Sequence, residues 1–334
     1  MLQELTGQVM QNRHLSQAQA ETALELMLLE ETPDVAIASF LSALAMKGET
    51  SDEIAGFARV MRRHVIAIRS KHHNTVDTAG TGGGLDTFNI STTAAFVIAG
   101  AGLPVAKHGN RAITSRCGSA DLLTALGVDV TGSARVAESC LNEIGLAFMF
   151  APHFHPSMKR VAAIRRQLGH RTVFNLLGPL TNPASAPFQI VGVYSPTLTE
   201  KIARSLAQLE CRRAWVVHSQ DGLDELSTGA SARISESSAD GVKTFEFDPR
   251  QFHMKPADWT SLHGGTPEQN AEITTGILRG KVKGAARDVV VLNAAAAIHL
   301  AADTDFCDAI RKAEESIDTG AAMEKVELLK KACA

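Results

Sequence analysis

The chain has 334 residues, of which 45% are apolar, and its formal net charge is −3. This length is sufficient for two unequal lobes that each bury a core. The nearly balanced charge, without a long basic or acidic run, argues against a nucleic acid or an anionic membrane surface as the main partner.

The cysteines and the apolar runs indicate where the protein works. The five cysteines are widely spaced and form no Cys-x-x-Cys motif, which favours reduced thiols over a disulfide or zinc framework. The N-terminal residues lack the basic and apolar regions of a secretory signal. The most apolar run, 289–302, is interrupted by Asn293 and His299, so we do not expect it to span a bilayer. We therefore expect a cytoplasmic protein.

The first 70 residues predict a small all-helical module. Ser16 is followed three residues later by Gln19, and Thr50 by Glu53, which are capping-box spacings at helix starts. Between these signals, apolar residues recur at helical spacing, and the pattern indicates about four helices.

From residue 75 onward, short β-like segments alternate with helical ones, at 75–77, 104–106, 148–150, 188–194 and 214–218. Such alternation predicts parallel βα units and therefore a mostly parallel sheet. Helical patterns return at 155–177 and from 267 to the end. We expect a helical domain of residues 1–70, joined by 152–183. The remaining segments, 71–151 and 184–334, would form a larger α/β domain.

A run of glycines, residues 80–84, follows the first predicted strand and precedes Asn89, Ser91 and Thr92 at the start of a helix. Glycines allow the backbone to approach a ligand, and successive N–H groups beside a helix N-terminus attract an anion. The run is neither a Gly-x-Gly-x-x-Gly fingerprint leading into a helix nor a Walker A loop. The alternative is an ordinary glycine-rich turn.

A second polar loop, Lys107-His108-Gly109-Asn110-Arg111, follows the next predicted strand, and hydroxyls, glycine and another arginine come directly after it. Parallel sheets bind ligands at the carboxyl ends of their strands, so this loop is a candidate second phosphate site. A solvated surface loop is the alternative. Two such loops on adjacent βα units favour binding more than either loop alone.

The adjacent carboxylates Asp224 and Glu225 follow the strand predicted at 214–218. Mg²⁺ is usually held by one or two carboxylates together with substrate phosphates and water. An isolated pair of this kind is far more often exposed on a surface. Beside two anion-binding loops, it becomes a candidate metal bridge to a pyrophosphate.

These motifs, in this order, resemble the anthranilate phosphoribosyltransferase family over nearly the whole chain. The matching segments are 80–83, 87–92, 107–111, 117–121, 165–169, 171–183 and 222–225. The resemblance implies a small helical domain and a larger α/β domain with the active site in the cleft between them. It also implies a homodimer formed through the helical domains, and transfer of a phosphoribosyl group from phosphoribosyl pyrophosphate to anthranilate with Mg²⁺.

The resemblance also implies roles for individual residues. Phosphoribosyl pyrophosphate would be bound by Gly80, Thr81, Gly83, Gly84, Thr87, Asn89, Ser91, Thr92, Lys107, Asn110, Ser115 and Ser119. Anthranilate would be bound by Gly80, His108, Asn110, His155 and Arg165, the last at its carboxylate. Ser91, Asp224 and Glu225 would hold Mg²⁺. Lys107 and Arg165 would act electrostatically, and no general base is assigned because an aromatic amine is already neutral near physiological pH.

The glycine run departs from the family, which usually reads Gly-Thr-Gly-Gly-Asp. Gly84 stands where that Asp is expected, and the stretch to Asn89 is one residue short. We expect the loss of this carboxylate to change the Mg²⁺ dependence, and Asp86 is a candidate to compensate for it in part.

Three alternative functions remain open at this stage. One is a related phosphoribosyltransferase that acts on another aromatic acid, which the altered loop permits. The second is a pyrimidine nucleoside phosphorylase, but such enzymes need no Asp-Glu metal pair. The third is a non-catalytic relative that binds nucleic acid, which would require a basic surface and degenerate loops.

Overall fold

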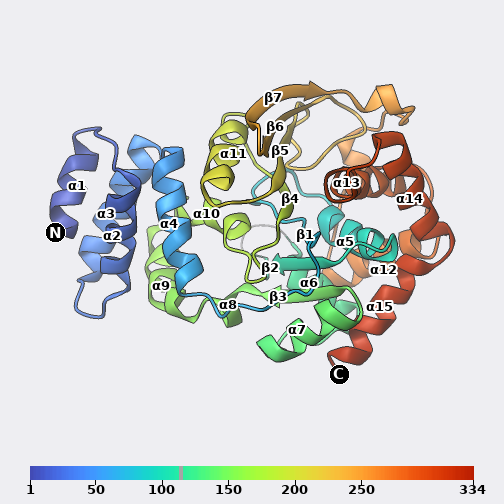
Figure 1. Ribbon diagram of the computed structural model, residues 1–334, viewed down its shortest axis with the longest axis horizontal. Coiled ribbons are helices and arrows are strands. Elements are labelled where there is room, and N and C mark those ends of the chain that lie inside the picture. Colours follow the sequence, from blue (N-terminus) through green and yellow to red (C-terminus); the bar gives the residue numbers. More distant parts are fainter. Residues whose placement is uncertain (113–115) are drawn as a thin grey trace.

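The computed structural model describes residues 1–112 and 116–334 and has two lobes, a small helical one and a larger α/β one (Figure 1). The helical lobe at the left of Figure 1 contains the N-terminus, and the C-terminus lies on the α/β lobe. This arrangement confirms the predicted fold class.

The first four helices form as the capping signals predict. They are α1 (Leu2–Met10), α2 (Gln17–Leu28), α3 (Asp34–Lys47) and α4 (Ser51–Arg63). Complete capping boxes begin α2 at Ser16 and α4 at Thr50. In each box, the hydroxyl and the side chain three residues later satisfy backbone N–H groups that the first helical turn leaves unpaired.

One seven-stranded sheet forms the centre of the α/β lobe, in the order β3-β2-β1-β4-β5-β6-β7. Its strands are β1 (Val76–Asp77), β2 (Val105–Gly109), β3 (Leu146–Phe150), β4 (Phe188–Gly192), β5 (Arg213–Ser219), β6 (Ala232–Ser238) and β7 (Gly241–Phe247). The five strands from β3 to β5 are parallel, which confirms the predicted βα units. The antiparallel hairpin β6–β7 was not predicted, because its sequence is polar and β7 is mostly exposed.

The remaining helices cover the sheet or lead back to the helical lobe. They are α5 (Ile90–Gly100), α6 (Ser119–Ala125), α7 (Ala134–Glu143), α8 (Ala151–Phe154), α9 (Lys159–Leu168), α10 (Phe174–Leu177), α11 (Leu198–Gln208), α12 (Pro267–Leu278), α13 (Ala285–Ala302), α14 (Phe306–Asp318) and α15 (Ala321–Ala332). The helical pattern predicted over 155–177 is interrupted. Gly169, with φ of 67°, ends α9 in a left-handed conformation that a side chain disfavours.

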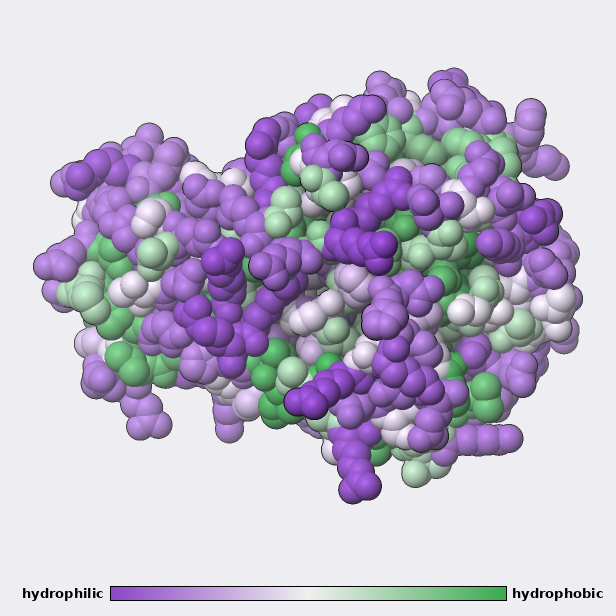
Figure 2. Space-filling view, in the orientation of Figure 1, coloured by the Kyte–Doolittle hydropathy of each residue, from purple (hydrophilic) through white to green (hydrophobic). Residues whose placement is uncertain are grey.

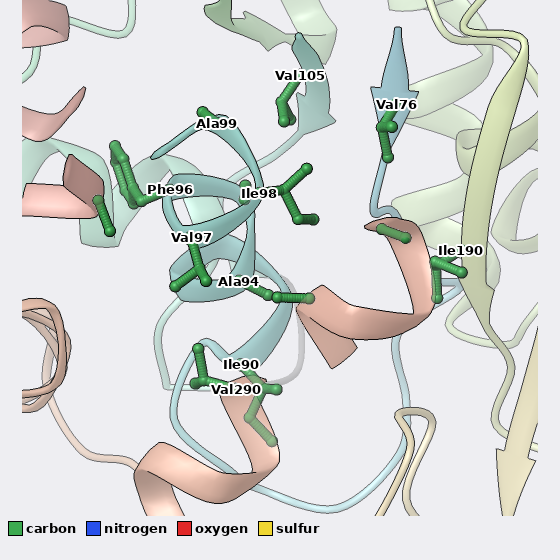
Figure 3. Close-up of a cluster of buried hydrophobic side chains, with 14 of the residues drawn as sticks. Val76, Ile90, Ala94, Phe96, Val97, Ile98, Ala99, Val105, Ile190 and Val290 are labelled. Atoms are coloured by element: carbon green, nitrogen blue, oxygen red, sulfur yellow. The ribbon is translucent and has the colours of Figure 1, made fainter. Parts of the chain in front are cut away.

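Both faces of the sheet are buried, because successive residues of the parallel strands point to opposite sides. In β5, Trp215 and Val217 join the core beneath α5 and α13, whereas Val216 joins the core that also holds the helical lobe. Figure 3 shows side chains of α5, such as Ile98, converging with Val76 and Val105 of the sheet. The helix α13 is long and apolar enough to cross a membrane, but 67% of it is buried inside the lobe.

The chain passes between the lobes three times, and the three crossing segments are hydrogen-bonded to one another. The Ile66 N–H donates to the Phe154 carbonyl at 2.9 Å, and the Ile68 N–H donates to the Pro183 carbonyl at 3.1 Å. Helices α9 and α10 contribute to the same hydrophobic cluster as α1–α4. Consequently the second crossing returns the chain to the helical lobe, and the third leads it to β4.

The close crossing of α2 and α4 yields a stability prediction. A Cβ at Gly56 would lie 2.5 Å from the Gln17 carbonyl oxygen and 2.8 Å from the Ala20 Cβ, whereas a Cβ at Gly7 in α1 would meet nothing within 4 Å. Overpacking costs about 1–3 kcal/mol, and a helical Gly→Ala change without a clash gains about 0.5–1 kcal/mol. We expect Gly56→Ala to lower the melting temperature and Gly7→Ala to preserve or raise it in scanning calorimetry. Equal shifts for the two variants would contradict this packing.

Candidate active site

A cavity of about 310 Å³ lies at the carboxyl ends of the central strands, where the glycine run and the second polar loop meet. Its lining includes ten of the residues named from the sequence: Gly80, Asn89, Ser91, Thr92, Lys107, His108, Asn110, Ser119, Asp224 and Glu225. Thr81, Gly83, Gly84, Thr87, His155 and Arg165 are not part of this lining, and Ser115 lies outside the described residues. A larger, open groove of about 450 Å³ lies at the opposite ends of the strands, and none of these candidates lines it.

The glycine loop (residues 80–84) is attached to the end of β4. The Thr81 N–H donates to the Gly192 carbonyl oxygen at 2.8 Å. Gly82 and Gly83 have φ values of 65° and 85°, a left-handed conformation that favours glycine. Ser91 and Thr92 lie in the first turn of α5, where backbone N–H groups have no helical partner. Together these segments form an anion-binding wall of the cavity.

The shortened loop lies against the carboxylate pair. A Cβ added at Gly84 would collide with an Asp224 carboxylate oxygen, so a side chain at this position would have to displace that carboxylate. Asp86, the candidate to compensate for the missing carboxylate, instead pairs with Arg116 at 3.4 Å and does not line the cavity. The carboxylate that lies next to the glycine loop is therefore that of Asp224, and not that of Asp86.

Lys107 is buried on β2 and provides the cation of the site. Its Nζ donates to the Thr78 carbonyl oxygen at 2.7 Å. Burial lowers the pKa of Lys107, and the nearby Asp77 and Glu225 carboxylates oppose that effect. The Lys107 ammonium is therefore close to two carboxylates, that of Asp77 in β1 and that of Glu225 in the cavity lining.

Asp77 and Asn182 hold this region together, although neither was named as a site residue from the sequence. Asn182 donates through Nδ2 to Asp77 Oδ2 at 2.7 Å and to the Ala106 carbonyl at 2.8 Å. The His108 N–H donates to Asp77 Oδ1 at 3.3 Å. Burial raises the pKa of Asp77 to about 6, and Lys107 counteracts it. The sequence signal that could have identified Asp77 is an Asp at the end of a predicted strand, three residues before Gly80.

The side chains of Ser91, Asp224 and Glu225 come together as a set of oxygen ligands. Burial and the neighbouring Asp224 carboxylate raise the pKa of Glu225 to about 8, while Lys107 and hydrogen bonds from Ser91 lower it. Burial also raises the pKa of Asp224. Two mutually repelling carboxylates and a hydroxyl suit Mg²⁺, which takes oxygen ligands. Among the described residues no cluster of three His, Cys, Asp or Glu forms, so substrate phosphates and water would complete the coordination.

Two histidine rings lie against each other in a tilted arrangement, and one of them, His108, lines the cavity. The His108 and His155 ring centroids are 5.1 Å apart, and the His108 Nδ1 lies 3.1 Å from the Gly178 carbonyl oxygen. Burial lowers the pKa of His108 to about 3 and that of His155 to about 4, so both rings are neutral at physiological pH. In each ring the Nε2 atom is buried without a partner. Neutral rings suit an aromatic ligand better than a phosphate.

Arg165 lies on α9 of the helical lobe, with its guanidinium carbon 5.3 Å from the centre of the Phe174 ring. Burial lowers the pKa of Arg165, but a guanidinium stays charged in proteins. The helix α9 that carries Arg165 belongs to the helical lobe, whereas the glycine loop belongs to the α/β lobe (Figure 1).

Comparison with known proteins agrees with this geometry. Residues 72–323 match the α/β domain of a glycosyl transferase family, and residues 3–65 match its helical bundle domain. The anthranilate phosphoribosyltransferase of Moorella thermoacetica is 50% identical over 331 residues, which cover 98% of this chain and 97% of the relative. That of Syntrophobacter fumaroxidans is 49% identical, with 98% of each chain covered.

Solved structures give the same result. The anthranilate phosphoribosyltransferase of Thermus thermophilus superposes with a TM-score of 0.92 at 38% identity, covering 98% of this chain and 99% of that one. That of Saccharomyces cerevisiae, in complex with phosphoribosyl pyrophosphate and Mg, superposes with a TM-score of 0.91 at 30% identity, covering 99% and 97% of the two chains. The chain therefore belongs to the anthranilate phosphoribosyltransferase family.

Proposed function

We propose that this chain transfers the phosphoribosyl group of phosphoribosyl pyrophosphate to the amino group of anthranilate and releases pyrophosphate, a step of tryptophan biosynthesis. The observation that carries the proposal is the meeting of the glycine loop, Lys107 and the Asp224-Glu225 pair around one cavity. This combination provides an anion-binding backbone, a buried cation and a metal-binding pair for a pyrophosphate.

In the reaction, the bond between the ribose C1 and the pyrophosphate oxygen breaks, and a bond to the anthranilate nitrogen forms. Positive charge develops on the ribose, as in other oxocarbenium-like transition states. Lys107 and the free N–H groups of the glycine loop and α5 stabilise the negative charge that develops on the leaving group. Mg²⁺, when bound at Ser91, Asp224 and Glu225, adds positive charge at the same oxygens.

Anthranilate would enter the cavity from the side of the helical lobe. Arg165 would bind its carboxylate, Asn110 and Gly80 would contact it within the cavity, and the neutral rings of His108 and His155 would line its path. The amine loses its proton only after it has attacked, so a strong general base is unnecessary. Holding the two substrates in position between the lobes would supply much of the rate enhancement.

The remaining assignments rest on the resemblance of the motifs to the family. We assign phosphoribosyl pyrophosphate to Gly80, Thr81, Gly83, Gly84, Thr87, Asn89, Ser91, Thr92, Lys107, Asn110, Ser115 and Ser119. We also propose a division into a helical domain (residues 1–70 with 152–183) and an α/β domain (71–151 and 184–334), supported by the packing of α9 and α10 with α1–α4. The five free thiols support a cytoplasmic location.

A homodimer formed through the helical domains is supported by apolar side chains that α1 and α3 leave exposed. Met46 is 90% exposed, Val35 76% and Met10 72%. In Figure 2, apolar atoms gather at the lower left, on the helical lobe. Large apolar side chains that remain exposed in one chain are typical of an interface with another.

Replacing Arg165 tests both the reaction and the anthranilate site. We expect the wild type to consume anthranilate, followed by its fluorescence, only when phosphoribosyl pyrophosphate and Mg²⁺ are present. Arg165→Ala should raise the anthranilate KM by about 10- to 100-fold, because a charged hydrogen bond contributes about 1.5–3 kcal/mol. The KM for phosphoribosyl pyrophosphate should not change. Arg166→Ala, at the exposed neighbour on α9, is the control. A folded wild type without turnover would refute the function, and turnover with other aromatic acids would define its specificity.

The raised pKa of Glu225, about 8, predicts the pH dependence of metal activation. Mg²⁺ must displace the proton that this carboxyl holds below that pH, so a fall from pH 7.5 to 6.5 should weaken apparent Mg²⁺ affinity by up to about tenfold. Mg²⁺ titrations of activity at the two pH values measure the effect. Glu225→Gln should abolish this pH dependence. The Mg²⁺ titration curve of Asp86→Ala should superimpose on that of the wild type. A displaced curve would support a compensating role for Asp86.

The exposed methionine of α3 tests the dimer. Met46→Lys places a charge in the proposed interface, while the free chain keeps its core because Met46 is 90% exposed. Light scattering after size exclusion should show a dimer for the wild type and a monomer for the variant. Lys312→Met, on α14 of the other lobe, should leave the mass unchanged. A monomeric wild type would contradict the dimer.

A further inference from the structure

Arg171 lies on the segment between α9 and α10 and reaches the glycine loop from the helical lobe. Its Nη2 donates to the Gly83 carbonyl oxygen at 3.2 Å. The mechanism above does not use Arg171, and Arg171 is not one of the residues that line the cavity. Burial raises the pKa of Asp224, and the charge of Arg171 is close enough to oppose that rise in part.

The guanidinium is supported from behind by an aromatic ring. The Arg171 guanidinium carbon lies 3.8 Å from the centre of the ring of Tyr194, which follows β4 and is the one tyrosine in the sequence. A planar guanidinium stacks on such a ring through the cation–π interaction and keeps its N–H groups free in the plane. Tyr194 therefore orients the donor that reaches Gly83.

The loop is shaped to accept this donor. The φ of 85° at Gly83 favours glycine, and a Cβ there would push the Arg171 guanidinium out of its observed position. On its other side, the loop is attached to Gly192 through Thr81 at 2.8 Å. The loop is thus held at two points. Thr81 bonds to Gly192 at the end of β4, and Gly83 bonds to Arg171, which lies on the Tyr194 ring just after β4.

The direction of these bonds matters for anion binding. Because the carbonyl of Gly83 is bonded to Arg171, its orientation is fixed, and the adjoining N–H groups of the loop can be presented together to a phosphate. A loop that is already ordered loses less conformational entropy when the ligand binds. This consideration is strongest for a glycine-rich loop, which has more conformational freedom than any other.

We propose that Arg171, stacked on Tyr194, is a positioning residue that holds the glycine loop in its pyrophosphate-binding conformation. Arg171 acts through the Gly83 carbonyl and does not bind the substrate itself. The proposal rests on the proposed function, because it assigns a pyrophosphate to this loop. It also gives the shortened loop a support that comes from the other lobe.

Five variants test the proposal: Arg171→Ala, Arg171→Lys, Tyr194→Leu, Tyr194→Phe and the double variant Arg171→Ala/Tyr194→Leu. Arg171→Ala and Tyr194→Leu should each raise the KM for phosphoribosyl pyrophosphate by about tenfold, with kcat and the anthranilate KM within twofold of wild type. The double variant should be no worse than either single variant, because both remove the same support. Tyr194→Phe keeps the stacking face and should match the wild type, and Arg171→Lys should fall between.

The matched control is Arg212→Ala. Arg212 also lies over an aromatic ring, 5.4 Å from the centre of Phe188, but at the opposite ends of the strands. It should leave all kinetic constants unchanged. Near-normal Tyr194→Leu beside an impaired Arg171→Ala would show that Arg171 contacts the substrate directly, and would overturn the proposal. Equal losses in kcat and in melting temperature would indicate a merely structural role and also overturn it.

Calorimetric titration with Mg²⁺ and inorganic pyrophosphate separates this proposal from the proposed function. If the wild type does not turn over anthranilate but binds pyrophosphate about tenfold more tightly than Arg171→Ala and Tyr194→Leu, the function is wrong and the role of Arg171 stands. If the three proteins bind pyrophosphate equally well, the role of Arg171 is refuted, whatever the enzyme does with anthranilate.

Discussion

The buried pair of Asp77 and Asn182 is the interaction on which the site depends. One amide group bonds to the carboxylate of β1 at 2.7 Å and to the Ala106 carbonyl of β2 at 2.8 Å. Asn182 belongs to the segment that returns from the helical lobe, so this bond fixes the boundary between the lobes against two central strands. A buried carboxylate is costly without partners. Here Asn182, the His108 N–H and the charge of Lys107 stabilise the Asp77 carboxylate. In turn, that carboxylate attracts the Lys107 ammonium, which lines the cavity.

The two lobes also share a hydrophobic core. The core beneath the helical lobe continues to the sheet, because Val191 of β4 and Val216 of β5 pack in the same cluster as α1–α4. The crossing segments are hydrogen-bonded to one another. The helical lobe is therefore joined to the sheet by a continuous core, and its Arg171 reaches the Gly83 carbonyl oxygen of the glycine loop.

Much of the fold could be predicted from local signals. The capping boxes at Ser16 and Thr50 depend on residues three positions apart, and the parallel strands depend on short apolar runs, so neighbouring residues suffice. The hairpin β6–β7 could not be predicted in this way. Its strands are stabilised by pairing with β5 and with each other, and that pairing is invisible in a polar stretch. The interruption of 155–177 likewise depends on the left-handed conformation of Gly169.

By itself, the sequence determined the order of elements, the glycine run, the second polar loop, the carboxylate pair and the family, because each is carried by residues close together in the chain. The tertiary structure alone decided how these parts meet. It placed Asp224 against Gly84, where a side chain would displace the Asp224 carboxylate, and paired Asp86 with Arg116. It brought Arg171 and Tyr194 to Gly83 from two other segments. Such contacts join residues far apart in the chain, so their geometry follows from packing, and no local pattern encodes it.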